Sequence, residues 1–159
     1  MRGVHRLAAV LAAAVAVVVL AACGQQTATI HVQDANGNDA VVDLKNGPVL
    51  FVAYWCPHCE HFLRTAKEAG LDRFPTVVSI WPRQGDTLKD VVRATKAKLD
   101  RTGWGGTPFY VLMDDAPSYV QGTPTLAWWD GKRIQAANPL EMGPEEVKRL
   151  IQQTAVDEQ

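Results

Sequence analysis

Cys56 and Cys59 enclose Pro57 and His58, and this Cys-Pro-His-Cys tetrapeptide is the part of the chain best suited to covalent chemistry. Two thiols at this spacing can close a disulfide and exchange it with another one. At the start of a helix, unpaired N–H groups and the helix dipole lower the pKa of a cysteine. Proline fits the first helical turn because its missing N–H is not needed there. We therefore assign Cys56 as the nucleophile and Cys59 as the resolving thiol.

The flanking residues predict that the tetrapeptide joins a buried strand to a helix. An apolar run over 49–54 precedes it and predicts the strand. Residues with helical spacing follow on one face, namely Cys59, Phe62, Leu63 and Ala66. A purely structural disulfide is the alternative, but so short a loop closes little chain entropy and would add little stability. The context favours a redox-active disulfide, with no other cofactor.

A metal site is a second interpretation of the same residues. Cys56, His58, Cys59 and His61 are ligand types that suit zinc or Cu(I). However, no second Cys-x-x-Cys or distant histidine pair completes a closed site. On a helix that starts at Cys56, the two histidines would also face different directions. The alternative to an enzyme is thus a metallochaperone that uses Cys56, Cys59 and a histidine, and we assign no metal ligand.

Length and charge limit the class of protein. The chain has 159 residues, which is enough for one domain with a sizeable core. Its net charge is −1, and no basic cluster is suited to nucleic acid. Residues 1–22 contain Arg2 and Arg6 and no acidic residue. The whole chain has 16 basic and 17 acidic residues, so removal of 1–22 leaves 14 basic and 17 acidic residues and a net charge of −3. This slight acidity argues against electrostatic binding to a membrane surface.

Residues 1–22 are expected to be a secretory signal. A short basic region is followed by an apolar run over 7–22, which is short for a lasting membrane span. The run ends in Leu-Ala-Ala-Cys at Cys23 and resembles the lipobox of bacterial lipoproteins. The resemblance implies a lipid on Cys23, a tether over 23–27 and a domain on the extracytoplasmic face of the bacterial cell membrane, where disulfides persist. An ordinary signal peptide or a signal anchor is the alternative.

The remaining pattern predicts an α/β domain over 28–159. Strands at 28–32 and 39–44 would form an N-terminal β-hairpin around an Asn-Gly turn. Further strands are expected at 76–81, 109–113 and 125–129, and helices at about 87–101 and from Gly143 to Ile151. We expect a central mixed sheet of about five strands, flanked by helices.

The tetrapeptide, its flanks and a downstream Thr123-Pro124 together resemble the thioredoxin superfamily. Cys-Pro-His-Cys is the tetrapeptide of DsbA-type thiol oxidases, and 47–55 is similar to the TlpA-type membrane-tethered members. The resemblance implies that the downstream proline is cis and faces the cysteines, while the residue before it presents its backbone to the substrate. Pro108 is a rival for this position. We prefer Pro124, because a strand and a hairpin turn follow it directly.

The resemblance also assigns roles around the cysteines. Pro57 and His58 would tune the Cys56 thiolate, and Trp55, Thr123 and Pro124 would line the substrate groove. The implied activity is thiol–disulfide exchange with protein substrates, with a membrane redox partner and a monomeric domain. The tetrapeptide favours an oxidant and the TlpA-like frame a reductant. We place oxidation slightly ahead.

Leu50 departs from the pattern of the family. Thioredoxin-like reductases often have a buried Asp or Glu six residues before the first cysteine, which helps to move the proton of the resolving cysteine. Leu50 cannot do so, which leaves Glu60, Glu68 or a bound water as candidates.

Four basic residues on the predicted helix at 87–101 are expected on its solvated side, and they are Lys89, Arg93, Lys96 and Lys98. A docking surface for an acidic partner is the alternative interpretation of this group.

Overall fold

The structure is a computed structural model that describes residues 27–71 and 75–153. The predicted signal and Cys23 lie outside these residues. In chain order the elements are β1 (Thr29–Gln33), β2 (Asp39–Asp43), the 3-10 helix η1 (Leu44–Asn46), β3 (Val49–Val52), α1 (Pro57–Glu68), β4 (Thr76–Ser79), α2 (Leu88–Arg101), β5 (Phe109–Val111), β6 (Thr125–Trp129), β7 (Ile134–Ala137) and α3 (Pro144–Gln153). Within the described ranges, no helix is long and apolar enough to cross a membrane.

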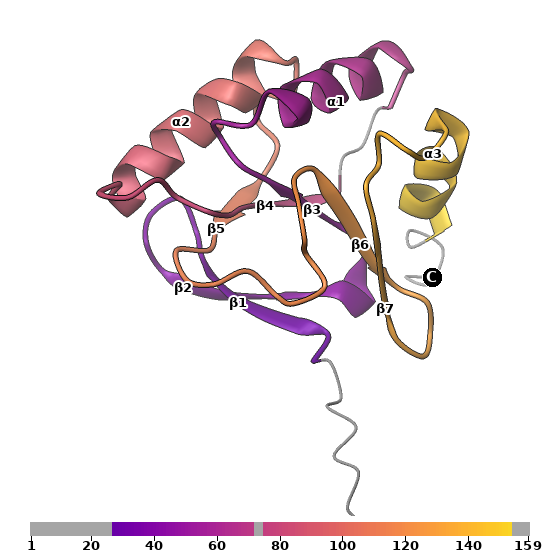
Figure 1. Ribbon diagram of the computed structural model, residues 1–159, viewed down its shortest axis with the longest axis horizontal. Coiled ribbons are helices and arrows are strands. Elements are labelled where there is room, and N and C mark those ends of the chain that lie inside the picture. The colour runs from indigo at the N-terminus through magenta and orange to yellow at the C-terminus, as the bar shows by residue number, and fades with distance from the viewer. Residues whose placement is uncertain (1–26, 72–74, 154–159) are drawn as a thin grey trace, which may run out of the picture.

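All the strands belong to one mixed sheet in the order β2-β1-β5-β4-β3-β6-β7 (Figure 1). The central strands β3, β4 and β5 are parallel, and the outer pairings are antiparallel. The predicted α/β fold and its N-terminal hairpin are confirmed. The expected number of about five strands is wrong, because the described chain contributes seven. The hairpin joins the sheet edge through a pairing of Gln33 with Val111 and thereby adds two strands.

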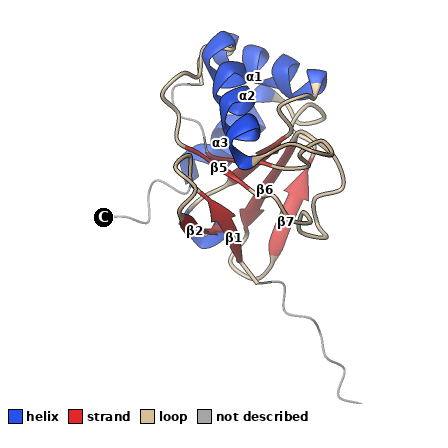
Figure 2. Ribbon diagram, turned by 90° about the vertical axis from the view of Figure 1, so that its left-hand side faces the viewer, coloured by secondary structure: helices blue, strands red, loops and turns tan. Residues whose placement is uncertain are grey.

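Alternation along β3 divides the core between the two faces of the sheet. Leu50 and Val52 pack with the buried side chains of the three α-helices, whereas Val49 and Phe51 pack on the opposite face. Figure 2 shows α1 and α2 together on one side of the strands. Each fully buried aliphatic or aromatic side chain contributes about 1.5–3 kcal/mol. Both faces of β3 are therefore fixed, and with them the point where the chain leaves the sheet toward the cysteines.

Candidate active site

Cys56 is the N-cap of α1, and its thiol takes the part that a serine or aspartate oxygen often plays. The backbone of Cys56 is extended, with φ −80° and ψ 119°, and its sulfur accepts a hydrogen bond from the N–H of Cys59 at 3.4 Å. Pro57 follows in the first helical turn. Both thiols are free, and Cys59 is completely buried whereas Cys56 retains 4% of its exposure. Cys56 is therefore the sulfur nearer to solvent.

The two thiols have opposite acidities. Burial works to raise the pKa of Cys56, but hydrogen bonding from the Thr123 side chain and from the backbone N–H groups of Cys59 and His58 outweighs it, so this pKa is lowered. Burial raises the pKa of Cys59 to about 12. In a reduced pair, Cys56 is thus the thiol that ionises more readily, and Cys59 stays protonated at neutral pH. This division matches the predicted roles of nucleophile and resolving cysteine.

The loop before β6 brings Thr123 and Pro124 against the cysteines. The Cys56 thiol donates a hydrogen bond to the carbonyl oxygen of Thr123 at 3.4 Å, across 67 positions of the chain. The peptide bond between Thr123 and Pro124 is cis, so the preference for Pro124 over Pro108 is confirmed. The same loop lines a hollow of about 430 Å³, together with Tyr119 and the end of β7.

A second wall of the site comes from the connection between β4 and α2. Trp55 is 39% exposed, and its indole N–H donates to the carbonyl of Trp81 at 2.9 Å. The Tyr54 hydroxyl donates to Asp86, which also accepts from the backbone N–H of Arg83. Trp81 has φ 54°, in the left-handed region that non-glycine residues rarely adopt. The indole hydrogen bond holds Trp55 in place next to Cys56 in the chain, and the role of Trp55 in a substrate groove stays a prediction.

The structure contradicts the expectation that Lys98 is on the solvated side of its helix. Its side chain is buried, with 1% of its surface exposed. Its ammonium nitrogen donates a hydrogen bond of 2.6 Å to the carbonyl oxygen of Cys56. Lys89, Arg93 and Lys96 are exposed as predicted. Lys98 is the residue of the site that the sequence analysis missed.

Among the described residues, neither of the two glutamates considered in the absence of an acid at position 50 forms a hydrogen bond with a cysteine thiol. Leu50 itself is fully buried among the cysteines and the helices. Glu60 is bound by Arg64 at 3.0 Å and by Arg101 at 2.9 Å, and these contacts lower its pKa to about 2. Glu68 is an exposed residue at the far end of α1. Glu60 is thus a weak proton acceptor.

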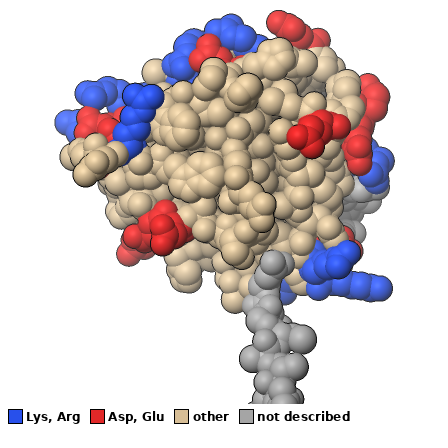
Figure 3. Space-filling model, viewed as in Figure 1, with Lys and Arg blue, Asp and Glu red and all other residues tan. Residues whose placement is uncertain are grey.

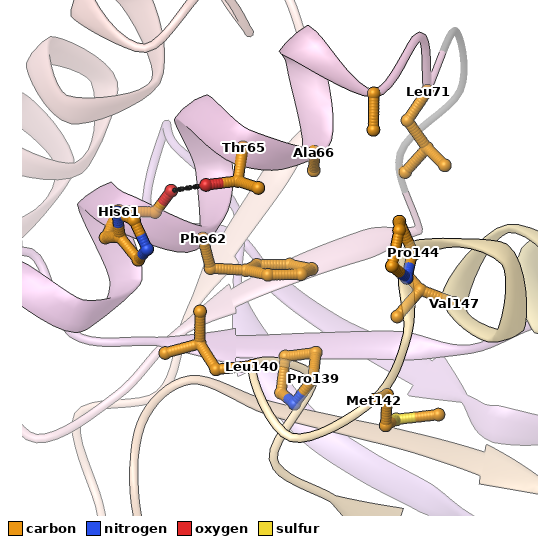
Figure 4. Close-up of a pocket in the computed structure, with 11 residues that line it drawn as sticks. His61, Phe62, Thr65, Ala66, Leu71, Pro139, Leu140, Met142, Pro144 and Val147 are labelled. Carbon is orange, nitrogen blue, oxygen red and sulfur yellow. Dashed lines mark hydrogen bonds between the residues drawn. The ribbon is translucent and has the colours of Figure 1, made fainter.

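His58 and His61 are both exposed on α1. Figure 4 shows His61 at the edge of an apolar hollow of about 220 Å³ between α1 and the segment that leads into α3. Within the described residues, no group of three or more His, Cys, Asp or Glu side chains could hold a metal ion. The metallochaperone alternative therefore lacks a third ligand in position.

Comparison with known proteins identifies the fold. No family model and no curated protein matches the sequence. A secreted Mycobacterium tuberculosis disulfide oxidoreductase homologous to E. coli DsbE is 14% identical, with a TM-score of 0.53 over 78% of this chain and 95% of that one. A thio-disulfide isomerase from Thermus thermophilus is 21% identical, with a TM-score of 0.51 over 82% and 94%. The chain has a thioredoxin fold.

A third similar structure extends the range of proteins that share this thioredoxin fold. BsSco, a member of the Sco family of cytochrome c oxidase assembly proteins, is 13% identical, with a TM-score of 0.51 over 83% of this chain and 94% of that one. At such identities the likeness concerns the fold. The function must therefore be argued from the site itself.

The opposite acidities of the two thiols can be measured by alkylation. In the Cys59→Ser variant, we expect iodoacetamide to label Cys56 with a pH midpoint below that of an unperturbed cysteine, because a lowered pKa increases the thiolate fraction at neutral pH. In the Cys56→Ser variant, Cys59 should stay unlabelled at neutral pH, because its pKa is about 12. Equal labelling of the two variants at pH 7 would contradict this assignment.

Proposed function

We propose that this protein is a thiol–disulfide oxidoreductase that exchanges disulfides with protein substrates through Cys56 and Cys59. The observation that carries the proposal is the position of the Cys56 sulfur. It caps α1, has a lowered pKa, and lies against the Thr123 carbonyl with Cys59 buried behind it. Two proteins with the same fold, the M. tuberculosis oxidoreductase and the T. thermophilus isomerase, carry the same class of activity in their names.

In the oxidising direction, a substrate thiolate attacks the Cys56 sulfur of the Cys56–Cys59 disulfide. The bond between the two cysteines breaks, and Cys59 leaves and takes up a proton. A second substrate thiolate then attacks the substrate sulfur of the mixed disulfide and releases Cys56 as a thiolate. The substrate loses two electrons and becomes a disulfide, and the cysteine pair gains them. The reducing direction runs through the same steps in reverse.

Oxidation is the favoured direction. A lowered pKa at Cys56 stabilises the reduced form of the pair, and a pair with a stable reduced form is a stronger oxidant. We propose that His58 adds to this stabilisation, while Trp55, Thr123 and Pro124 form the substrate groove.

One broad face of the molecule carries few charged side chains. On the face that Figure 3 shows, acidic and basic side chains lie mostly toward the rim, and the broad centre carries neither. The loop between β5 and β6 crosses the same face (Figure 1). A neutral surface attracts and repels no particular partner at long range. This supports a general protein thiol or disulfide as the substrate, and argues against nucleic acid.

The roles of the two cysteines can be separated by trapping. With a substrate protein that carries a disulfide, Cys59→Ser should accumulate a mixed disulfide at Cys56. The Cys56 thiolate attacks the substrate disulfide and releases one substrate thiolate, and no resolving thiol can then displace the partner. Cys56→Ser should lose exchange altogether. Nonreducing gels and mass spectrometry report both results. Turnover by both variants would refute the proposed function.

The direction of the reaction can be read from the reduction potential of the pair. Equilibration with glutathione should give a value nearer to roughly −120 mV, as for DsbA, than to roughly −270 mV, as for thioredoxin. His58→Pro should make the pair less oxidising, because it removes both the imidazole and the backbone N–H of residue 58, and that N–H helps to lower the pKa of Cys56. His61→Ala, on the same exposed helix, is the matched control and should leave the potential unchanged. An unchanged potential in His58→Pro would remove His58 from the mechanism.

We further propose that the domain is attached to the extracytoplasmic face of the bacterial membrane by lipid on Cys23, where it meets a membrane redox partner. Each buried CH₂ of an acyl chain contributes about 0.8 kcal/mol, so two or three chains hold a protein firmly. Cys23→Ala should therefore move the protein from the membrane pellet to the soluble fraction after cell fractionation. A variant that stays in the pellet would point to a retained helical anchor.

A further inference from the structure

Lys98 is the charged residue that the proposed exchange leaves unexplained. It is the one charged side chain that is buried in the part of the chain that the structure describes. It comes from α2, yet its nitrogen reaches the Cys56 carbonyl, where the backbone N–H of Glu60 also donates at 3.4 Å. The ammonium group is thereby held at the first turn of α1, in the turn that carries both cysteines.

This ammonium group makes no ion pair with a carboxylate among the described residues. Glu60 is bound by two arginines, and the site of the missing acid is filled by Leu50. An ammonium has three N–H donors, and a neutral carbonyl oxygen satisfies one of them without neutralising the charge. A buried charge without an opposite charge is costly. The group that can supply a negative charge here is a cysteine thiolate.

The electrostatics around Lys98 agree with this pairing. Burial lowers the pKa of Lys98, and attraction to Cys59 opposes that effect, with a smaller contribution of the same sign from Cys56. The other charged groups that act on it are Arg101, which lowers its pKa, and Glu60, which raises it. Attraction between two groups is mutual, so the ammonium favours ionisation of the thiols.

We propose that the buried ammonium of Lys98 is a positioning group that stabilises the cysteine thiolate and so makes the Cys56–Cys59 pair more oxidising. The inference rests on the proposed exchange function and assigns the charge that sets its direction. When the pair is oxidised, the two sulfurs lose two electrons and their remaining protons and form an S–S bond, so the thiolate disappears. Lys98 thus stabilises the reduced form alone. A buried carboxylate at position 50 would have the opposite effect.

Lys98 also bears on the release of substrate. Cys59 attacks the Cys56 sulfur of the mixed disulfide as a thiolate, which forms the Cys56–Cys59 bond and breaks the bond to the substrate. The substrate sulfur leaves as a thiolate and takes up a proton from solvent. Burial raises the pKa of Cys59 and opposes its ionisation. A fixed positive charge beside the cysteines offsets part of that cost without accepting the proton.

The test compares Lys98→Met with Lys96→Met in the full chain. Lys96 lies on the exposed side of the same helix, where it pairs with Asp100 at 2.7 Å. At equilibrium with glutathione, Lys98→Met should shift the pair about tenfold toward the oxidised form, which for two electrons is about 30 mV. In Lys98→Met, the pH midpoint of Cys56 alkylation should move to a higher pH than in the wild type. Lys96→Met should match the wild type in both measurements. A folded Lys98→Met with unchanged equilibrium and midpoint would overturn the inference.

A measurement on the wild-type protein guards against a variant that fails to fold. The pKa of Lys98, followed by NMR of its terminal CH₂–NH₃⁺ group, should be higher in the reduced than in the oxidised form, because the thiolate exists in the reduced form alone. Equal values in the two forms would refute the role of Lys98. If the wild-type pair forms no reversible disulfide, the proposed function fails and the inference falls with it. A measurable potential that does not respond to Lys98→Met overturns the inference alone.

Discussion

The hydrogen bond from the Cys59 N–H to the Cys56 sulfur is the contact on which the arrangement of the site depends. It makes the reactive atom part of the end of α1, so the position of the sulfur follows from the position of the helix. The helix is held by its apolar face against the sheet, and the cis peptide bond at Pro124 fixes the carbonyl that meets the sulfur from the other side. Packing far from the sulfur thereby determines its surroundings.

Local sequence signals predicted the cysteine site well. The apolar run before Trp55, the proline after Cys56 and the spacing of Phe62 and Leu63 all describe a strand that passes into a helix, and each is a short-range property. The turn residues around β6 likewise distinguished Pro124. These features can be predicted because the residues that determine them are close together in the sequence.

The rest depends on contacts between distant segments. The pairing of Gln33 with Val111 adds the hairpin to the sheet, and no local sequence pattern predicts this pairing. Lys98 is a different case, because it follows Val91 and Thr95 at helical spacing and so lies on the buried face of α2. The charge of Lys98 predicts a side chain exposed to solvent, whereas its spacing along the helix predicts a side chain on the buried face. The periodicity was correct, since the Cys56 carbonyl gives the ammonium a partner inside the protein.

The position of β1 relative to α1 would set the height of the cysteines above a membrane if the chain were anchored at its N-terminal end. In both ribbon views β1 lies toward one end of the molecule and α1 toward the other (Figures 1 and 2). Four peptide bonds link Cys23 to Thr27, and at full extension this segment spans about 14 Å at most. An anchor at Cys23 would therefore hold the β1 end of the domain near the bilayer and the α1 end, where Cys56 caps the helix, at a greater height above it. A membrane partner would have to carry its own thiols on a domain or loop that rises to the same height.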